Sequence, residues 1–143
     1  MIFLLNTDTR KVVSLTDSAI DTESNIAEYV KNYDVKHLKF KDGVTPTYFV
    51  IGAIKSPQRE KILDESHTFI TGSNKMQSNF HTRNREAFRY GVKDIENFGA
   101  DIKRNGDRTI SDDTMSAIPS DVVDEIGTLI INGNKIDAVT EKN

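Results

Sequence analysis

Short apolar segments near the start of the chain predict β-strands. Ile2 to Leu5 is apolar, residues 6–9 have turn chemistry, and Lys11 to Leu15 is rich in β-branched residues. Two such runs separated by turn residues are typical of a β-hairpin, and its short strands need a partner layer. The opening of the chain therefore predicts a hairpin covered by another element.

A second pair of strands is predicted over residues 35–40 and 47–54, on either side of the turn signal Asp42-Gly43. Residues 47–54 contain a continuous apolar run, Tyr48 to Ile51, which is typical of a central strand buried on both faces. Pro46 precedes this strand, at a position where a missing backbone donor is tolerated.

Helical patterns alternate with these strands. Thr22 is a candidate N-cap of a helix whose apolar face carries Ile26, Tyr29, Val30 and Tyr33. Ser56-Pro57 predicts the start of a second helix that runs to about Asp64, because proline is favoured at the first helical position. A polar loop is predicted over residues 66–78.

The strongest helical pattern covers residues 79–97, where one face carries Phe80, Ala87, Phe88, Gly91, Val92, Ile95 and Phe98. Asn84 lies on the same face. It either bonds to a backbone group near the frayed first turn or is a buried polar group that fixes the register of a partner.

The last third of the chain predicts a hairpin and a helix. Asn105-Gly106 lies between Asp101–Lys103 and Arg108–Ile110 and predicts a surface hairpin with a two-residue turn. Ile118-Pro119-Ser120-Asp121 precedes a helix whose apolar face carries Val122, Val123, Ile126, Leu129 and Ile130, and Asn132-Gly133-Asn134 ends it.

These elements predict an α+β fold, a small antiparallel sheet of about four strands packed with three to four helices and a surface hairpin. We expect one domain over residues 1–131 and a polar C-terminal tail over residues 132–143. The longest apolar run, Met1 to Leu5, is too short to span a membrane and has no secretory signal pattern, so no membrane partner is expected.

The side-chain composition predicts no catalytic centre, metal or cofactor. Cysteine is absent, His37, His67 and His81 have no metal-ligand spacing, and no phosphate-binding glycine motif occurs. Asp64 to His67 contains a hydroxyl, an imidazole and carboxylates, but adjacency in sequence does not make a catalytic triad. Residues 101–107 lack the ligand pattern of a calcium loop.

Charge is unevenly distributed although the net charge is only −3. Residues 79–93 carry four basic side chains and one acidic, whereas residues 107–143 carry eight acidic and three basic. These are either solvated faces that partly neutralise each other or an interaction surface. The interrupted basic field and the acidic balance argue against dedicated nucleic-acid binding.

One row of side chains carries a binding hypothesis. His81, Arg85, Arg89 and Lys93 recur every four residues and could clamp an acidic partner, so charge reversal at Arg85 and Arg89 is expected to weaken assembly and leave the monomer folded. The candidate contact surfaces are this row, the 66–78 loop, the hairpin at Asn105 and Gly106, and the acidic C-terminal segment.

The order of several segments resembles small tailed-phage proteins described as tail assembly chaperone-like or minor virion proteins. The resemblance covers roughly residues 47–143. It rests on the segments Thr47–Leu63, Glu86–Asn97, the Asn-Gly hairpin, Ile118–Gly127 and the charged ending Glu141-Lys142-Asn143.

This resemblance implies a non-enzymatic bacteriophage accessory structural protein that docks on larger virion components, in the capsid, portal vertex or tail. Its partners would be phage structural proteins, with several copies per assembly, in the host cytoplasm during assembly and then in the virion. A transient tail assembly chaperone that is not retained in the particle is the alternative. A small phage-encoded enzyme is a remote one, to be revived by any turnover that depends on His67 or His81.

Overall fold

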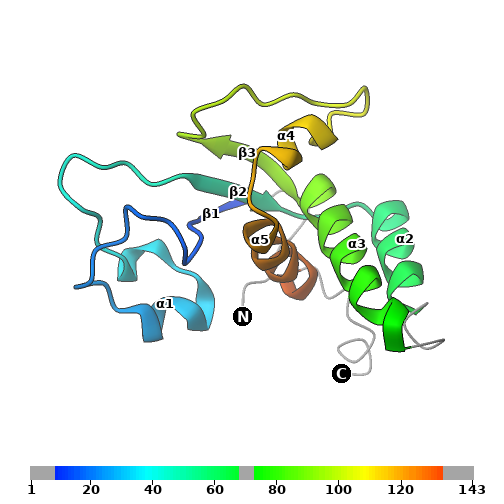
Figure 1. Ribbon diagram of the computed structural model, residues 1–143, viewed down its shortest axis with the longest axis horizontal. Coiled ribbons are helices and arrows are strands. Elements are labelled where there is room, and N and C mark those ends of the chain that lie inside the picture. Colours follow the sequence, from blue (N-terminus) through cyan, green and yellow to red (C-terminus); the bar gives the residue numbers. More distant parts are fainter. Residues whose placement is uncertain (1–8, 68–72, 134–143) are drawn as a thin grey trace.

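Residues 9–67 and 73–133 are described by a computed structural model, in which α-helices pack around a three-stranded antiparallel sheet of order β1-β2-β3. The α+β class is therefore as predicted, with three strands in the described part of the chain (Figure 1). The strands are β1 (Thr9–Val12), β2 (Tyr48–Gly52) and β3 (Val92–Glu96); the helices are α1 (Ile26–Asn32), α2 (Ser56–His67), α3 (Ser73–Gly91), α4 (Asp112–Ser116) and α5 (Ser120–Gly133), with a 3-10 turn at Val35–His37.

Strand β2 is the central strand, as its apolar run predicts. Phe49 and Ile51 lie two residues apart and face the core, where Phe49 packs edge-on against Phe88 of α3 with ring centroids 5.9 Å apart. Tyr48 and Val50, on the other face of the strand, are only half-buried. Burial is therefore complete on one face of this strand and partial on the other.

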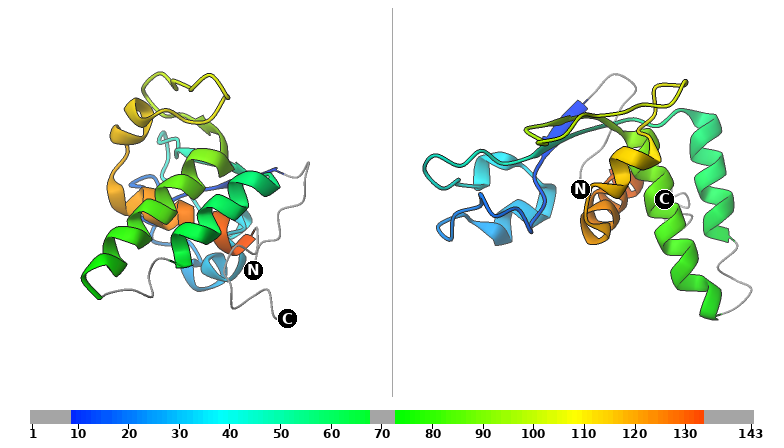
Figure 2. Two further views of the ribbon diagram at one scale, coloured as in Figure 1. Left: turned by 90° about the vertical axis from the view of Figure 1, so that its right-hand side faces the viewer. Right: turned by 45° about the horizontal axis from the view of Figure 1, so that its top comes forward.

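Helices α3 and α5 cross beneath the sheet and supply most of the remaining core (Figure 1). The apolar face predicted for the last helix is confirmed, because Val122, Val123, Ile126 and Ile130 are buried. Helix α2 begins at Ser56 as predicted, continues three residues past Asp64, and lies beside α3 at one end of the molecule (Figure 2).

The long connection between β1 and β2, residues 13–47, forms a small lobe at the other end of the molecule (Figures 1 and 2). Its own core consists of Val13, Tyr29 and Leu38. The buried Tyr29 hydroxyl donates to the Val13 carbonyl at 2.5 Å and accepts from the Val13 amide at 2.9 Å. One side chain thus satisfies both backbone groups where the chain leaves β1.

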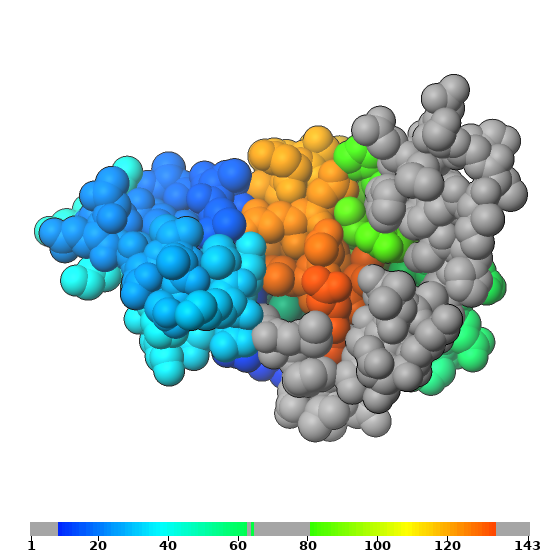
Figure 3. Space-filling view, turned by 90° about the horizontal axis from the view of Figure 1, so that it is seen from below, coloured from blue at the N-terminus to red at the C-terminus, as the bar shows by residue number. Residues whose placement is uncertain are grey.

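The lobe is fastened to the rest of the molecule through Glu125 of α5. The Glu125 carboxylate accepts hydrogen bonds from Ser14 Oγ at 2.6 Å, from the Leu15 amide at 3.0 Å and from the Tyr33 hydroxyl at 3.2 Å. Seen from below, the lobe lies directly against α5 (Figure 3). A single carboxylate therefore connects three points of the lobe to the helix that underlies the sheet.

Several predictions in the lobe are wrong. Helix α1 begins at Ile26 and is capped by Asn25, because residues 21–25 are bonded along residues 37–39, for example Asn25 N to His37 O at 2.9 Å. Tyr29 faces the lobe core as expected, but Ile26 and Val30 are exposed. The hydrophobic pattern of such a short helix did not identify its buried side.

The strand predicted over residues 35–40 is also wrong. Asp34 caps the 3-10 turn through its carboxylate, and Phe40 forms only an isolated bridge with Ile20. The turn at Asp42-Gly43 is present, with Gly43 at φ 72° and Val44 N bonded to Lys41 O at 3.1 Å. It does not join paired strands, because β2 pairs with β1 and β3.

The first predicted hairpin is only partly tested, since Ile2 to Leu5 lies outside the described residues. Its second strand begins two residues earlier than predicted: it is β1, Thr9–Val12, and it pairs with β2. Ser14 and Leu15 leave the sheet to bond with Glu125.

The predicted 66–78 loop and the end of the 79–97 helix are wrong. Helix α2 extends to His67 and α3 begins at Ser73, while residues 92–96 form β3. The register of β3 against β2 pairs Val50 with Asp94 and Ile51 with Val92, and so skips Lys93. Because of this bulge, Val92 and Ile95 both face the core although they are three residues apart. Their spacing is therefore the same as on one face of a helix, which explains the wrong prediction.

The Asn105-Gly106 segment forms a wider loop than the predicted two-residue hairpin. A single bridge joins Arg104 to Ile110, and the turn is closed by Arg108 N donating to Asn105 O at 2.9 Å. Arg108, at φ 70°, takes the left-handed conformation within it. Thr109 bonds to the Asp107 carboxylate through its amide and hydroxyl, which favours this longer loop.

Helix α4 was not predicted, because its sequence is polar. Ser111 caps it by accepting from the Thr114 amide at 3.3 Å, and only Thr114 and Met115 are buried. Helix α5 ends at Gly133 as predicted, and the residues after it lie outside the described part of the chain.

Asn84 is buried and lies where α3 crosses α5. Its Nδ2 reaches Asp124 Oδ1 of α5 at 3.4 Å, a long contact between the two helices. Of the two interpretations, this position agrees better with a buried polar group at a helix-helix contact than with a frayed first turn, because α3 begins eleven residues earlier.

Candidate functional site

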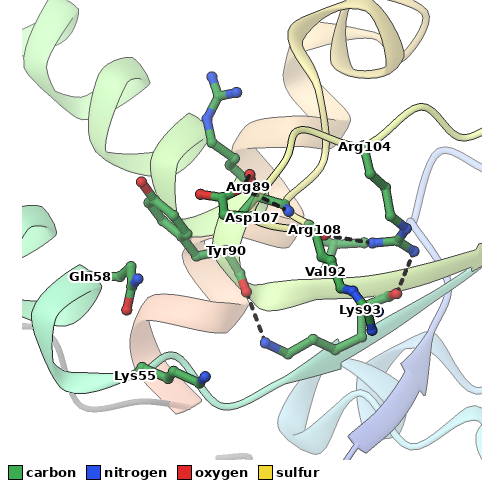
Figure 4. A pocket seen from close by; sticks show the side chains of 10 residues that line it. Lys55, Gln58, Arg89, Tyr90, Val92, Lys93, Arg104, Asp107 and Arg108 are labelled. Carbon is green, nitrogen blue, oxygen red and sulfur yellow. Dashed lines mark hydrogen bonds between the residues drawn. The ribbon is translucent and has the colours of Figure 1, made fainter.

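A hollow of about 600 Å³ opens between the start of α2, the junction of α3 with β3, and the 104–109 loop. Figure 4 shows the side chains around it. Its lining residues are Lys55, Gln58, Arg89, Tyr90, Val92, Lys93, Arg104, Asp107, Arg108 and Thr109. Five of these ten are cationic and one is acidic, so the hollow is a positively charged concavity on a protein whose net charge is −3.

Two of the five cations hold the walls of the hollow. Arg104 donates to the Lys93 carbonyl at 2.7 Å and to the Arg108 carbonyl at 3.1 Å, which ties the loop to β3 (Figure 4). Arg89 is only 15% exposed; it pairs with Asp112 and Glu86 and donates to the Ile110 carbonyl at 3.3 Å. Both guanidinium groups are thus engaged by the protein itself.

The other three cations, Lys55, Lys93 and Arg108, have no carboxylate partner among the described residues. The acidic lining residue, Asp107, forms no ion pair with these cations among the described residues, and its carboxylate accepts from the Thr109 hydroxyl and amide of its own loop. These bonds lower the pKa of Asp107 and keep it charged. The positive charge of the hollow therefore rests on three side chains from three different segments.

Lys93 owes its position to the bulge in β3. A bulge re-aims a side chain relative to the regular alternation of a strand, and the skipped residue here is Lys93. Its ammonium group donates to the Tyr90 carbonyl at 2.9 Å and extends toward Lys55 across the hollow (Figure 4). Partial burial and the neighbouring charge of Lys55 lower the pKa of Lys93, the expected effect of two ammonium groups that share one site.

Gln58 also lines this space, but its side-chain oxygen is not accessible from it. Its Oε1 atom is buried and has no hydrogen-bond partner among the described residues. A buried acceptor without a donor is unfavourable by about 1–3 kcal/mol.

The structure divides the predicted row of cations between two places. Arg89 and Lys93 line the cationic hollow, whereas His81 and Arg85 line a second hollow of about 340 Å³ beside α4 and the start of α5. His81 Nδ1 lies 2.7 Å from Asp124 Oδ2, and Arg85 lies 3.5 Å from Asp112. Lys93 belongs to β3 and not to the helix. The remaining predicted pair, Asn105 and Gly106, lies in the exposed loop that borders the cationic hollow.

These contacts give the uneven charge distribution a partly internal role. Basic side chains of α3 pair with acidic side chains of α4 and α5, so the two regions neutralise each other in part within the fold. Reversing the charge of Arg89 would break its pairs with Asp112 and Glu86 as well as any external contact. Charge reversal at Arg89 therefore cannot distinguish a loss of docking from a loss of folding.

Sequence reasoning missed Lys55, Gln58, Arg104 and Arg108. Lys55 and Gln58 lie at the predicted start of a helix, and Arg104 and Arg108 flank the predicted turn, so no local pattern marks them as parts of one site. No sequence period joins residues that are almost fifty positions apart. Only the pairing of β2 with β3 brings them together.

Comparison with known proteins gives no relative: no family model, curated protein or solved structure matches the chain. Within residues 9–67 and 73–133, no helix is long and apolar enough to cross a membrane. The same part of the chain holds no group of three metal-ligating side chains.

Proposed function

We propose that the protein is a non-enzymatic docking protein that binds an acidic segment of a larger protein in the cationic hollow. The observation that supports this is the gathering of Lys55, Lys93 and Arg108 around one open space without a carboxylate partner among the described residues. Like charges held together repel one another, and a bound anionic group relieves that repulsion.

An acidic protein segment fits the hollow better than nucleic acid does. Nucleic-acid binding generally uses a stripe of cations along one face and a basic domain, whereas this chain carries a net charge of −3. Tyr90 is the one aromatic residue among the described residues of the lining, which leaves little surface for base stacking.

We further propose that the partner is a component of a tailed-phage particle, in the capsid, portal vertex or tail, and that several copies of the chain stay in the particle. This rests on the resemblance of residues 47–143 to small phage proteins, and the whole lining of the hollow, from Lys55 to Thr109, lies inside that span.

Mass spectrometry of purified particles tests the proposal. The chain should be present at a fixed copy number, and the double variant Lys55→Glu with Arg108→Glu should lower incorporation by about tenfold or more, since it reverses two charges at the docking site. Lys41→Glu is the matched control, because Lys41 is an exposed lysine of the lobe, away from the hollow.

Two outcomes would overturn parts of the proposal. Absence of the chain from mature particles, with presence in assembly intermediates, would replace the structural role with that of a tail assembly chaperone. Normal incorporation of the folded double variant would show that the hollow is not the docking site. Circular dichroism of each variant establishes that a loss of incorporation is not a loss of fold.

A further inference from the structure

The chain contains two Asn-Gly pairs, Asn105-Gly106 and Asn132-Gly133, and the structure places them in different environments. Asn105 and Gly106 are both exposed in the loop that borders the cationic hollow, whereas Asn132 and Gly133 lie in the last turn of α5. An asparagine followed by glycine is chemically labile, because glycine has no Cβ to shield its backbone nitrogen from the asparagine side chain. The local structure therefore decides which of the two pairs reacts.

We infer that Asn105 is a site of spontaneous deamidation, and that the reaction opens the 104–109 wall of the cationic hollow. The Gly106 nitrogen attacks Cγ of Asn105, so that an N–Cγ bond forms and the Cγ–Nδ2 bond breaks. Ammonia leaves with the proton of the Gly106 amide, and a cyclic succinimide remains. Water then opens one of the two C–N bonds of the ring, which gives aspartate or, through the other carbonyl, isoaspartate.

Three features of the turn favour this attack. The Gly106 amide has no hydrogen-bond partner among the described residues, so its nitrogen is free to react without a backbone bond being broken first. Asn105 is exposed, and its Nδ2 makes two hydrogen bonds, of 3.0 Å and 3.4 Å, of which the longer is weak. The Arg104 guanidinium lies against the same turn, 3.1 Å from the Arg108 carbonyl, and its charge favours the negative charge that develops there (Figure 4).

The second pair, Asn132-Gly133, is held by its helix. Inside a helix each amide donates to the carbonyl four residues earlier, and the regular backbone keeps that amide away from the preceding side chain. Gly133 is buried as well as helical. The last turn of α5 must therefore open before Asn132 reacts, which makes Asn132 the slower site within the same molecule.

Deamidation also changes the hydrogen bonds of the loop. In the folded loop Asn105 Nδ2 donates to Thr109 Oγ1, and the Thr109 hydroxyl donates in turn to the Asp107 carboxylate at 2.6 Å. A carboxylate at position 105 has no donor, and the single hydroxyl proton of Thr109 is already given to Asp107. The new carboxylate would lie against the Thr109 oxygen and the Ile110 carbonyl without a donor, which disfavours this turn.

The same change lowers the positive charge of the cationic hollow. Asp107, Arg108 and Thr109 line the hollow, so a rearranged turn displaces the Arg108 cation while a new negative charge arises at the rim. The chain therefore carries a one-way change from a cationic to a more neutral hollow. This inference does not depend on which anionic group the hollow binds.

The test is peptide mapping of the full chain by mass spectrometry, with electron-transfer fragments to distinguish isoaspartate, after incubation at neutral pH and physiological temperature. Deamidation at Asn105 should be about tenfold faster than at Asn132, a factor that corresponds to opening one backbone hydrogen bond first, and in urea the two rates should become equal. Aspartate and isoaspartate should both appear, because both arise from the ring, whereas direct hydrolysis gives aspartate alone.

Two variants complete the test. Gly106→Ala should slow the reaction about tenfold, since its Cβ shields the attacking nitrogen and meets nothing within 4 Å in the fold. Asn105→Asp supplies the product, and protection from amide exchange should fall about tenfold at position 105 and at Arg108, whose amides close the turn. Asn32→Asp, exposed in α1 of the lobe, is the charge-matched control and should leave the loop unchanged.

A rate at Asn105 no higher than at Asn132, aspartate as the only product, or a rate that Gly106→Ala does not change would overturn the assignment of Asn105. Unchanged protection in Asn105→Asp, or an equal loss of protection in Asn32→Asp, would overturn the opening of the loop.

Discussion

Replacing Gly127 with alanine tests how closely α5 approaches α3. A Cβ atom built on Gly127 would lie 2.4 Å from the backbone carbonyl oxygen of Asn84, whereas ordinary contact begins at 3.4 Å. The obstacle is backbone and not the end of a flexible side chain, so it cannot rotate away. The two helices would have to separate by about 1 Å, the difference between these distances.

That separation has a calculable effect on stability. Forcing an extra methyl group into a packed interior costs about 1–3 kcal/mol, and the upper end applies where a helix backbone must move. Alanine is more favourable than glycine in a helix interior by about 1 kcal/mol, which offsets part of this destabilisation. We therefore expect the free energy of unfolding to fall by about 2 kcal/mol.

Urea unfolding followed by circular dichroism measures this change. Gly106→Ala is the control, since a Cβ there meets nothing within 4 Å and Gly106 has no positive φ. A Gly127→Ala protein as stable as the parent, or more stable, would refute the close approach of the helices. Equal destabilisation by both substitutions would show that the effect is not specific to the helix crossing.

Three further predictions concern the lobe. Glu125→Ala should lower the free energy of unfolding by about 2 kcal/mol, because it removes the acceptor of three hydrogen bonds, and should speed amide exchange at Leu15; unchanged exchange there would refute the role of Glu125. Tyr29→Phe should lower the free energy of unfolding in urea by about 3 kcal/mol, because two backbone groups of Val13 lose their partner in a buried site. A change below about 0.5 kcal/mol would contradict this account. Burial, with the adjacent charge of Glu125, raises the pKa of Tyr33 to about 12. Because this tyrosine then ionises first in the unfolded chain, the stability that is present below pH 10 should be lost between pH 10 and 12. Tyr33→Phe should reduce that loss, and an identical pH profile of the two proteins would refute the role of Tyr33.

Particular residues show why some elements could be predicted and others could not. Helix α5 carries a long apolar face, and β2 carries a continuous apolar run, so local pattern and final burial agree for Ile126 and Phe49. Local pattern and final structure disagree for the segment after Gly91, because Val92 and Ile95 repeat at a helical spacing that a bulge in a strand also produces. They disagree for helix α1 for another reason, because the periodicity of seven residues is too short to determine which side is buried against the lobe.

The sequence by itself determined the α+β class, the central strand, the start of α2 and the extent of α5, because each depends on a pattern of neighbours in the chain. Only the tertiary structure decided which cations are engaged by the protein and which face the hollow. Arg89 and Lys93 look equivalent in sequence, yet one is held by Asp112 and Glu86 and the other lies beside Lys55 without a carboxylate partner among the described residues. Charge is a property of single residues, whereas pairing depends on distances between residues that the chain places far apart.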